Sequence, residues 1–316
     1  MNKAVLTELK RAIKHNLEEL ANQIVRSKGV YLSNRDLFSL FTYMNKLENY
    51  PYKVIEYIHI ESTGRLLSIS PYRFFSMNSA CFAGHTNIVR LLLKYGDRYD
   101  DPTSDRSYAI RSASMNGYIE IVRLLLEDGR ADPAENSNYA IRYACMYGNV
   151  DVVRLLLADG RANPRSLNDE AIYTASYKNY VEIVRLLLED GRADPSANDN
   201  SALFVAIEHG NTQIAQMLIE DGRTNPEARQ NAMIRLASQK GITNILRCML
   251  LDDRVDPVYP NNVAIQLACR EGHIDTVRVL LADDRVVKAG LDTAIKEARN
   301  RYDIVYLLME AKMRSV

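Results

Sequence analysis

Charged side chains that could do chemistry recur along this chain at a fixed interval. One column holds aspartates and two columns hold arginines: Asp128, Asp159, Asp190, Asp221, Asp252 and Asp283; Arg123, Arg154, Arg185, Arg247 and Arg278; Arg130, Arg161, Arg192, Arg223, Arg254 and Arg285. A stripe of arginines can hold phosphate groups, and a carboxylate can act as an acid or base. A catalytic carboxylate is usually one residue in an unusual environment, however. Because the aspartate column also lies two residues from an arginine column, we interpret all three as ladders of structural ion pairs.

The residue patterns that mark catalytic, metal and cofactor sites do not occur in the sequence. It contains no G-x-G-x-x-G, no phosphate-loop motif, no H-E-x-x-H and no C-x-x-C. His85 and His273 are expected to form hydrogen bonds at helix starts. Cys81, Cys145 and Cys269 follow an alanine at the same repeat position, which favours small buried side chains in a reduced interior over reactive thiols. We therefore predict no catalytic residue, no metal and no cofactor.

The charged columns belong to an internal repeat. The segment VEIVRLLLEDGRADP, which starts at Val181, has close counterparts that start near Tyr118, Asn149, Asn211 and Ile242. A proline column shows a period of 31 residues: Pro102, Pro133, Pro164, Pro195, Pro226 and Pro257. A second column has the same period: Gly117, Gly148, Asn179, Gly210, Gly241 and Gly272. A fixed period of this length is typical of a solenoid or another repeat array.

Each repeat is expected to contain two helices. The first holds the pattern A-I-x-x-A, as in Ala171 to Ala175, whose small side chains let neighbouring helices approach closely. The residues two before the first alanine are predicted to be N-caps: Ser107, Asn138, Asp169, Asn200 and Asp292. The second helix is amphipathic, and glycine is predicted to form its left-handed C-cap: Gly129, Gly160, Gly191 and Gly222. Asp253 and Asp284 replace this glycine in two later repeats, where we expect some strain in the cap.

The chain divides into an N-terminal region and the array. Residues 1–74 include an amphipathic helix over residues 3–27 and a second helix from about Asp36, but they do not fit the repeat. We predict that they form a helical cap. Residues 75–316 form about seven to eight repeats, of which the last, Asp292 to Ala311, is predicted to be a C-terminal cap.

Charge and hydropathy limit the possible partners and locations. The net charge is zero, with +4 on residues 1–75 and therefore −4 on residues 76–316, which does not favour nucleic-acid binding. The first 24 residues are too charged for a signal peptide, and no run of about 18 apolar residues occurs. We expect a cytoplasmic protein with no membrane contact.

The repeat resembles a known family. GHTNIVRLLLKYG (Gly84–Gly96) and GHIDTVRVLL (Gly272–Leu281) are similar to the second helix of ankyrin repeats, and A-I-x-x-A-x-x-x-G is similar to the first. The family's Thr-Pro-Leu-His opening is absent and the period is two residues short of the usual 33, which predicts a truncated hairpin loop. The D-P-S-A-N-x-N segment from Asp194 resembles arrays of amoebae and their giant viruses. The resemblance implies an all-α, ankyrin-type helix-turn-helix solenoid with an N-terminal helical cap.

The resemblance also implies where a partner would bind. In ankyrin repeats the end of the first helix faces the concave groove, and aromatic residues and methionine are enriched at protein interfaces. The candidate protein-binding residues are Phe82, Met115, Asn116, Arg142, Met146, Tyr147, Tyr173, Tyr177, Lys178, Phe204, Glu208 and His209. The alternative is that the rings only pack between neighbouring repeats.

These observations predict a non-catalytic scaffold that binds another protein on its concave face. We expect a monomer, located in the cytoplasm, or in the host cytoplasm if the protein is viral. A second hypothesis is an adaptor whose residues 33–75 recruit another partner, such as a ubiquitin-ligase component. Its only support is the pattern L-x-x-x-D-L-F-x-L-F at Leu32–Phe41. An enzyme confined to residues 1–75 is disfavoured because that region is small and poor in histidine, cysteine and clustered acids.

Overall fold

The computed structural model describes residues 7–8, 10–12, 77–95, 101–225 and 228–314. Most of residues 1–74, predicted to be an N-terminal cap, lies outside the described residues, and so do the helix predicted from Asp36 and the segment Leu32–Phe41. The chain divides into two compact units, residues 1–135 and residues 136–316. Each unit is described by itself.

The described residues form pairs of helices joined by turns, with no strand among them, which confirms the all-α prediction. The first helices of the pairs are α5 (Met77–Ala83), α7 (Ser104–Met115), α9 (Glu135–Tyr147), α11 (Ser166–Tyr177), α13 (Ala197–Glu208), α15 (Ala228–Lys240), α17 (Val263–Glu271) and α20 (Asp292–Ala298). The second helices are α6 (Thr86–Tyr95), α8 (Ile119–Asp128), α10 (Val150–Asp159), α12 (Val181–Asp190), α14 (Thr212–Glu220), α16 (Thr243–Leu250), α18 (Ile274–Leu281) and α21 (Tyr302–Arg314). A short helix, α19 (Asp284–Lys288), precedes α20.

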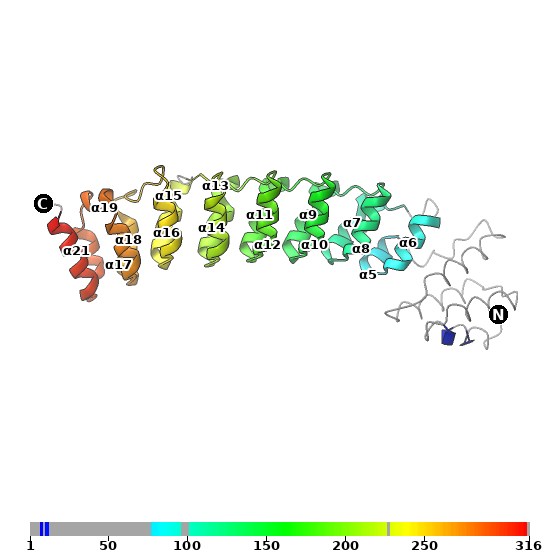
Figure 1. Ribbon diagram of the computed structural model, residues 1–316, viewed down its shortest axis with the longest axis horizontal. Coiled ribbons are helices and arrows are strands. Elements are labelled where there is room, and N and C mark those ends of the chain that lie inside the picture. The colour runs from blue at the N-terminus through cyan, green and yellow to red at the C-terminus, as the bar shows by residue number, and fades with distance from the viewer. Residues whose placement is uncertain (1–6, 9, 13–76, 96–100, 226–227, 315–316) are drawn as a thin grey trace. The chain divides into compact units, whose positions relative to one another are not determined.

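Both units are built from stacked helix pairs. In residues 136–316 the pairs follow one another in chain order (Figure 1). The first helices α11, α13, α15, α17 and α20 pack side by side in one layer, and the second helices from α10 to α21 pack side by side in another. In residues 1–135, α5 packs on α7 and α6 on α8 in the same way. Because each helix contacts mainly its own pair and the adjacent pairs, the core is a continuous strip between two layers.

Small residues of the first helix and branched residues of the second fill this strip. Ala144 and Ala175, which we predicted to lie between helices, have no exposed surface. In α12 the side chains of Ile183, Val184 and Leu187 are also fully buried. The predicted roles of the alanine pattern and of the amphipathic second helix are therefore confirmed.

The three cysteines of the repeat position are buried, as predicted. Cys81, Cys145 and Cys269 lie in the core and form no disulfide. Burial disfavours the thiolate, and it raises the pKa of Cys81 and of Cys269 to about 12. These thiols are therefore protonated at neutral pH. A reactive cysteine, in contrast, has a lowered pKa and is ionised there.

The first helices begin differently from the prediction. In α9 the residues Asn136, Ser137 and Asn138 all have positive φ, between 55 and 57°. Equivalent left-handed turns begin α7, α11 and α13. Left-handed backbone costs most residues about 1–2 kcal/mol each, and asparagine and aspartate tolerate it best. The prediction that Asn138 and its counterparts act as N-caps is wrong. Ser107, Asn138, Asp169 and Asn200 lie in these left-handed turns, whereas an N-cap has extended backbone, and Asp292 is the first helical residue of α20, after Leu291.

These side chains instead bind the next repeat. Asn138 Oδ1 accepts a hydrogen bond from the backbone N–H of Asn163, at 2.6 Å. The same bond, always 25 residues along the chain, occurs at five positions: Ser107 to Asp132, Asn138 to Asn163, Asp169 to Asp194, Asn200 to Asn225 and Asn231 to Asp256. Each left-handed turn is therefore held by a bond to the loop of the next repeat. In the last repeat Asp292 lies inside α20 and contacts Lys312.

The ends of the second helices confirm one prediction and correct another. Gly191 follows α12 with φ at 77°, which is the predicted left-handed C-cap. Asp253 and Asp284 do not adopt this conformation, so the predicted strain is wrong. Without a glycine, α16 ends at Leu250 and α18 ends at Leu281, and each helix continues into a right-handed turn.

A second glycine column makes room for the following repeat. A Cβ atom on Gly148 would lie 2.9 Å from the Tyr180 ring, and one on Gly241 would lie 2.6 Å from the His273 ring. The Nε2 atom of His273 also lies 2.9 Å from the Gln239 carbonyl oxygen, which confirms its expected hydrogen-bonding role. Each ring therefore fits on the repeat before it only because a glycine is there.

Candidate protein-binding surface

The ends of the first helices in the second unit carry an exposed group of rings. Tyr147 at the end of α9 is 56% exposed, and Tyr173 and Tyr177 of α11 are 39% and 44% exposed. These large rings therefore remain in solvent. The buried positions nearby hold alanines, Ala144 and Ala175. We call the residues around them the aromatic surface: Met146, Tyr147, Tyr173, Tyr177, Lys178 and His209.

Neighbouring side chains hold the Tyr177 ring in place. The His209 ring, from the next repeat, meets it edge-on with centroids 4.7 Å apart. The Lys178 ammonium lies 5.3 Å from the Tyr177 ring centroid, within the range of a cation–π contact. His209 Nδ1 in turn lies 3.0 Å from the Val205 carbonyl oxygen. The ring is therefore ordered before any partner arrives, which lowers the entropic cost of binding.

Helix α9 contributes a row of tyrosines that our sequence analysis did not include in full. The Tyr139 and Tyr143 rings are stacked, with centroids 3.7 Å apart and planes within 7°. The Tyr143 and Tyr147 rings are 6.2 Å apart and tilted by 31°. The signal that could have revealed Tyr143 is its spacing, since side chains four residues apart lie together on a helix.

Arg142 was predicted to contact the partner, but it binds within the protein. Its side chain is only 11% exposed, and Nε lies 2.5 Å from Glu170 Oε2 of the next repeat. The guanidinium also donates to the Ser137 carbonyl and lies 5.8 Å from the Tyr143 ring centroid. Arg142 therefore supports the tyrosine row and the junction of two repeats rather than offering a free charge.

The remaining candidates of the second unit differ in exposure. Met146 and Phe204 are half-buried, whereas Lys178, Glu208 and His209 are exposed. The candidates of the first unit form a separate group. Phe82 is 52% exposed.

In that first unit, Asn116 connects two repeats. Its side-chain amide donates to the Ser112 carbonyl at 3.0 Å and to the Phe82 carbonyl at 3.4 Å. Met115 is half-buried and Asn116 is exposed. Phe82 therefore presents an exposed ring on a residue whose backbone carbonyl accepts from this amide, on a smaller scale than the aromatic surface of the second unit.

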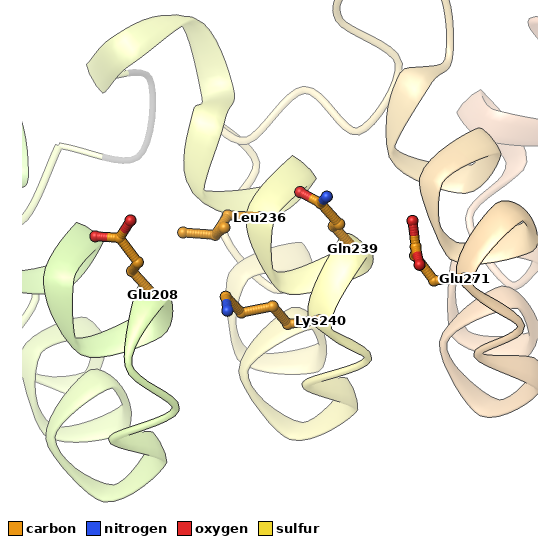
Figure 2. A pocket seen from close by; sticks show the side chains of 5 residues that line it. All are labelled: Glu208, Leu236, Gln239, Lys240 and Glu271. Atoms are coloured by element: carbon orange, nitrogen blue, oxygen red, sulfur yellow. The ribbon is translucent and has the colours of Figure 1, made fainter.

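A polar hollow lies at the same end of the first helices, beyond the aromatic surface. It measures about 410 Å³ and is lined by Glu208, Leu236, Gln239, Lys240 and Glu271. Figure 2 shows that these side chains come from three successive first helices, with Leu236 between Glu208 and Gln239. The hollow combines both signs of charge with one apolar side chain, so it forms a polar border to the rings.

The arginine column that follows the second helices pairs with the aspartate column, as predicted. Arg192 binds both carboxylate oxygens of Asp190, with two contacts of 2.8 Å. Its guanidinium also donates to the carbonyl groups of Leu157, Gly160 and Ala162 in the preceding repeat. Arg223 and Arg285 also donate to carbonyl groups of the preceding repeat, so these arginines make structural contacts and are not an open stripe for phosphate groups.

Within the described residues, no group of three or more histidine, cysteine, aspartate or glutamate side chains is placed to hold a metal ion. None of the helices in the described ranges combines the length and apolar character required to cross a membrane.

Comparisons with known proteins were made for the whole chain. The family model for ankyrin repeats, which spans three copies, matches residues 71–137 and 141–233, just over half of the chain. Among solved structures, the chain is similar to an ankyrin repeat domain from Acinetobacter baumannii AYE, with 23% identity and a TM-score of 0.48. That match covers 58% of this chain and 98% of the other. No curated protein matches the chain.

Proposed function

Because the chain belongs to the ankyrin repeat family, we propose that it is a non-catalytic scaffold that binds a partner protein on the concave face of its solenoid. Ankyrin repeats generally mediate protein–protein interactions. We place the centre of the binding site on the aromatic surface of α9, α11 and the end of α13. The polar hollow would form part of its rim.

The observation that carries this proposal is the exposure of ordered rings. Tyr147 and Tyr177 are about half exposed, and Tyr177 is held by contacts with Lys178 and His209. Tyrosine offers a large rigid surface with little loss of conformational entropy, and its hydroxyl can bond to a partner or to water. Such rings are tolerated in solvent, whereas a patch of leucines of that size would favour aggregation.

The test is to remove the rings and measure affinity. A pull-down with the intact chain identifies a partner, and calorimetry then compares variants. Truncation of a central aromatic residue typically costs about 2 kcal/mol, so Tyr147→Ala and Tyr177→Ala are each expected to weaken binding about thirtyfold. Leu251→Ala is the control, because Leu251 is 86% exposed and follows the second helix α16.

Circular dichroism would check that each variant keeps its helices. Normal binding by both tyrosine variants would contradict the proposed site. Weak binding by all three variants would indicate a general loss of structure or a site elsewhere.

The other expectations stay predictions. These are the cytoplasmic location (host cytoplasm for a viral protein), the lack of nucleic-acid and membrane partners, and the resemblance to arrays of amoebae and giant viruses. The adaptor hypothesis also stays a prediction, because residues 33–75 lie outside the described residues. A pull-down with residues 1–75 alone would distinguish it from a simple cap, which should capture nothing.

A further inference from the structure

The last described helix, α21, keeps the register of the other second helices. Ile304 and Leu308 are buried in α21, as Ile183 and Leu187 are buried in α12. An acidic residue lies in the first turn of both helices. The two helices can therefore be compared residue by residue.

This register shows that α21 lacks both arginine columns. Tyr306 occupies the position of Arg185, and Met313 occupies the position of Arg192. Arg185 forms an ion pair with Glu182, and Arg192 forms one with Asp190. Tyr306 is therefore apolar where α12 carries a charge, and Met313, which lies inside the longer helix α21, replaces an arginine that follows Gly191 after the end of α12.

The replacements form a continuous stripe. Tyr302, Tyr306, Met309 and Met313 are 79%, 71%, 50% and 72% exposed. Their spacing of four, three and four residues places them on one face of the helix. That face is opposite the one that carries Ile304 and Leu308, so α21 is apolar on both sides.

A helix that is apolar on both sides is normally covered on both, and exposed apolar patches mark interaction sites. We propose that the stripe of α21 binds the same stripe of a second copy of this chain, with the two helices antiparallel. The protein is then a dimer, in place of the monomer expected from the sequence.

The charges of α21 favour this partner and this orientation. Asp303 lies in its first turn. Lys312 and Arg314 lie in its last turn, where they pair with Asp292 and with Glu310 at the exposed surface and remain partly in solvent. In an antiparallel pair, the acidic end of each helix lies against the basic end of the other, and the helix dipoles also oppose. Asp303 and Arg314 border the same side of the stripe, so each faces its counterpart across the two-fold axis. A parallel pair would place like charges together.

The size of the stripe predicts a weak dimer. Helix α21 has 13 residues and is therefore about 20 Å long. Two tyrosines and two methionines bury an area at the lower end of the range for stable protein interfaces. We expect association in the micromolar range, with monomer at high dilution.

Sedimentation of the intact chain over a wide concentration range tests the dimer. The mass should rise from 35.9 kDa towards twice that value as concentration reaches about 100 μM. The double variant Tyr306→Arg with Met313→Arg restores the arginines of the other repeats, so it should fold normally yet remain a monomer. Leu251→Arg, a substitution at a residue that follows α16 and is 86% exposed, is the matched control and should still dimerise.

Charge reversal tests the orientation. Asp303→Arg alone and Arg314→Asp alone should each weaken association more than tenfold, whereas the two together should restore it. A chain that stays at 35.9 kDa throughout would overturn the proposal. A dimer that persists in the Tyr306→Arg and Met313→Arg double variant would also overturn the proposal. Failure of the paired reversal to restore association would overturn the antiparallel arrangement.

Discussion

The interior repeat of α11 and α12 and the last repeat of α20 and α21 have the same core but different outer faces. Both bury an alanine in the first helix, Ala175 and Ala298, and an isoleucine and a leucine in the second. Only the interior repeat carries the two arginines that pair with acids. The two repeats thus share the apolar residues between the two helix layers. Their outward-facing residues differ, and those positions can take either a structural or a binding role.

Overpacking the alanine position should give the largest difference between the two repeats. Ala175→Leu is expected to cost about 1–3 kcal/mol, because Ala175 is fully buried and α11 lies between α9 and α13 (Figure 1). Ala298→Leu should cost less, since α20 packs on α17 on one side only among the described helices. Urea unfolding monitored by circular dichroism measures both costs. Equal costs would show that the last repeat is as tightly enclosed as the interior ones.

The left-handed turns provide the next comparison. Asn200 is fully buried, and its Oδ1 accepts from the Asn225 N–H at 3.0 Å. Asn200→Ala leaves that N–H unpaired and should cost about 1.5 kcal/mol. Asp292→Ala, at the equivalent position of the last repeat, should cost much less because Asp292 is exposed and binds only Lys312 in the described structure. The same unfolding experiment would contradict this account if the two variants were equally destabilised.

Exchanging the outer residues should have a smaller effect. Arg192→Met gives the interior repeat the residue of the last one. It removes the pair with Asp190 and the bonds to three carbonyl groups. Because Arg192 is about one-third exposed, the expected loss is about 1 kcal/mol or less. Met313→Arg should leave stability nearly unchanged, and a large loss there would mean that Met313 belongs to the core.

The smallest effect concerns pH and has opposite signs in the two repeats. Burial raises the pKa of Asp169. The hydrogen bond from the Asp194 N–H lowers it, but by less, so the pKa is raised overall. An acid with a raised pKa binds its proton more tightly when folded, so its ionised form lowers stability at neutral pH and the loss disappears as pH falls. Asp169→Asn should therefore stabilise the protein at pH 7, and the gain should shrink in acid.

The equivalent Asp292 behaves in the opposite way. Its hydrogen bond with Lys312 lowers the pKa of the carboxyl. Its contribution is therefore present above the unfolded-state pKa and is lost as pH falls through the folded-state value. Asp292→Asn should slightly lower the melting temperature at pH 7 and have no effect in strong acid. Parallel melting curves of both variants at several pH values would refute this comparison if the two shifts had the same sign.

The sequence was sufficient to predict the scaffold, because each of its parts has a local signal. Ala175 and Leu187 follow helical spacing, and Gly191 marks a helix end. The exposure of Tyr147 and Tyr177 was also predictable, since their positions lie outside the core pattern. All of these depend on residues close together in the chain.

Contacts between repeats were not predictable in the same way. Asn138 binds a residue 25 positions away, and its left-handed backbone has no local signal as clear as a glycine. Arg142 is paired with Glu170, which is 28 positions away. From the sequence, Asn138 was equally suited to cap a helix, and Arg142 was equally suited to contact a partner. Only the stacking of the repeats decides between the two roles.

The fit of Tyr180 on Gly148 has a consequence for recombination between repeats. The two residues belong to neighbouring repeats, and a Cβ on Gly148 would clash with the ring. At the next position of the column Asn179 stands in place of glycine, and there the following repeat offers Asn211, which bonds to the Ser176 carbonyl at 2.8 Å. A second copy of this repeat placed directly after it would set the Tyr180 ring on Asn179, which has a Cβ, whereas the other positions of the column are glycines. Although the 31-residue period makes the repeats look interchangeable, this contact restricts which repeat can directly follow Asn179.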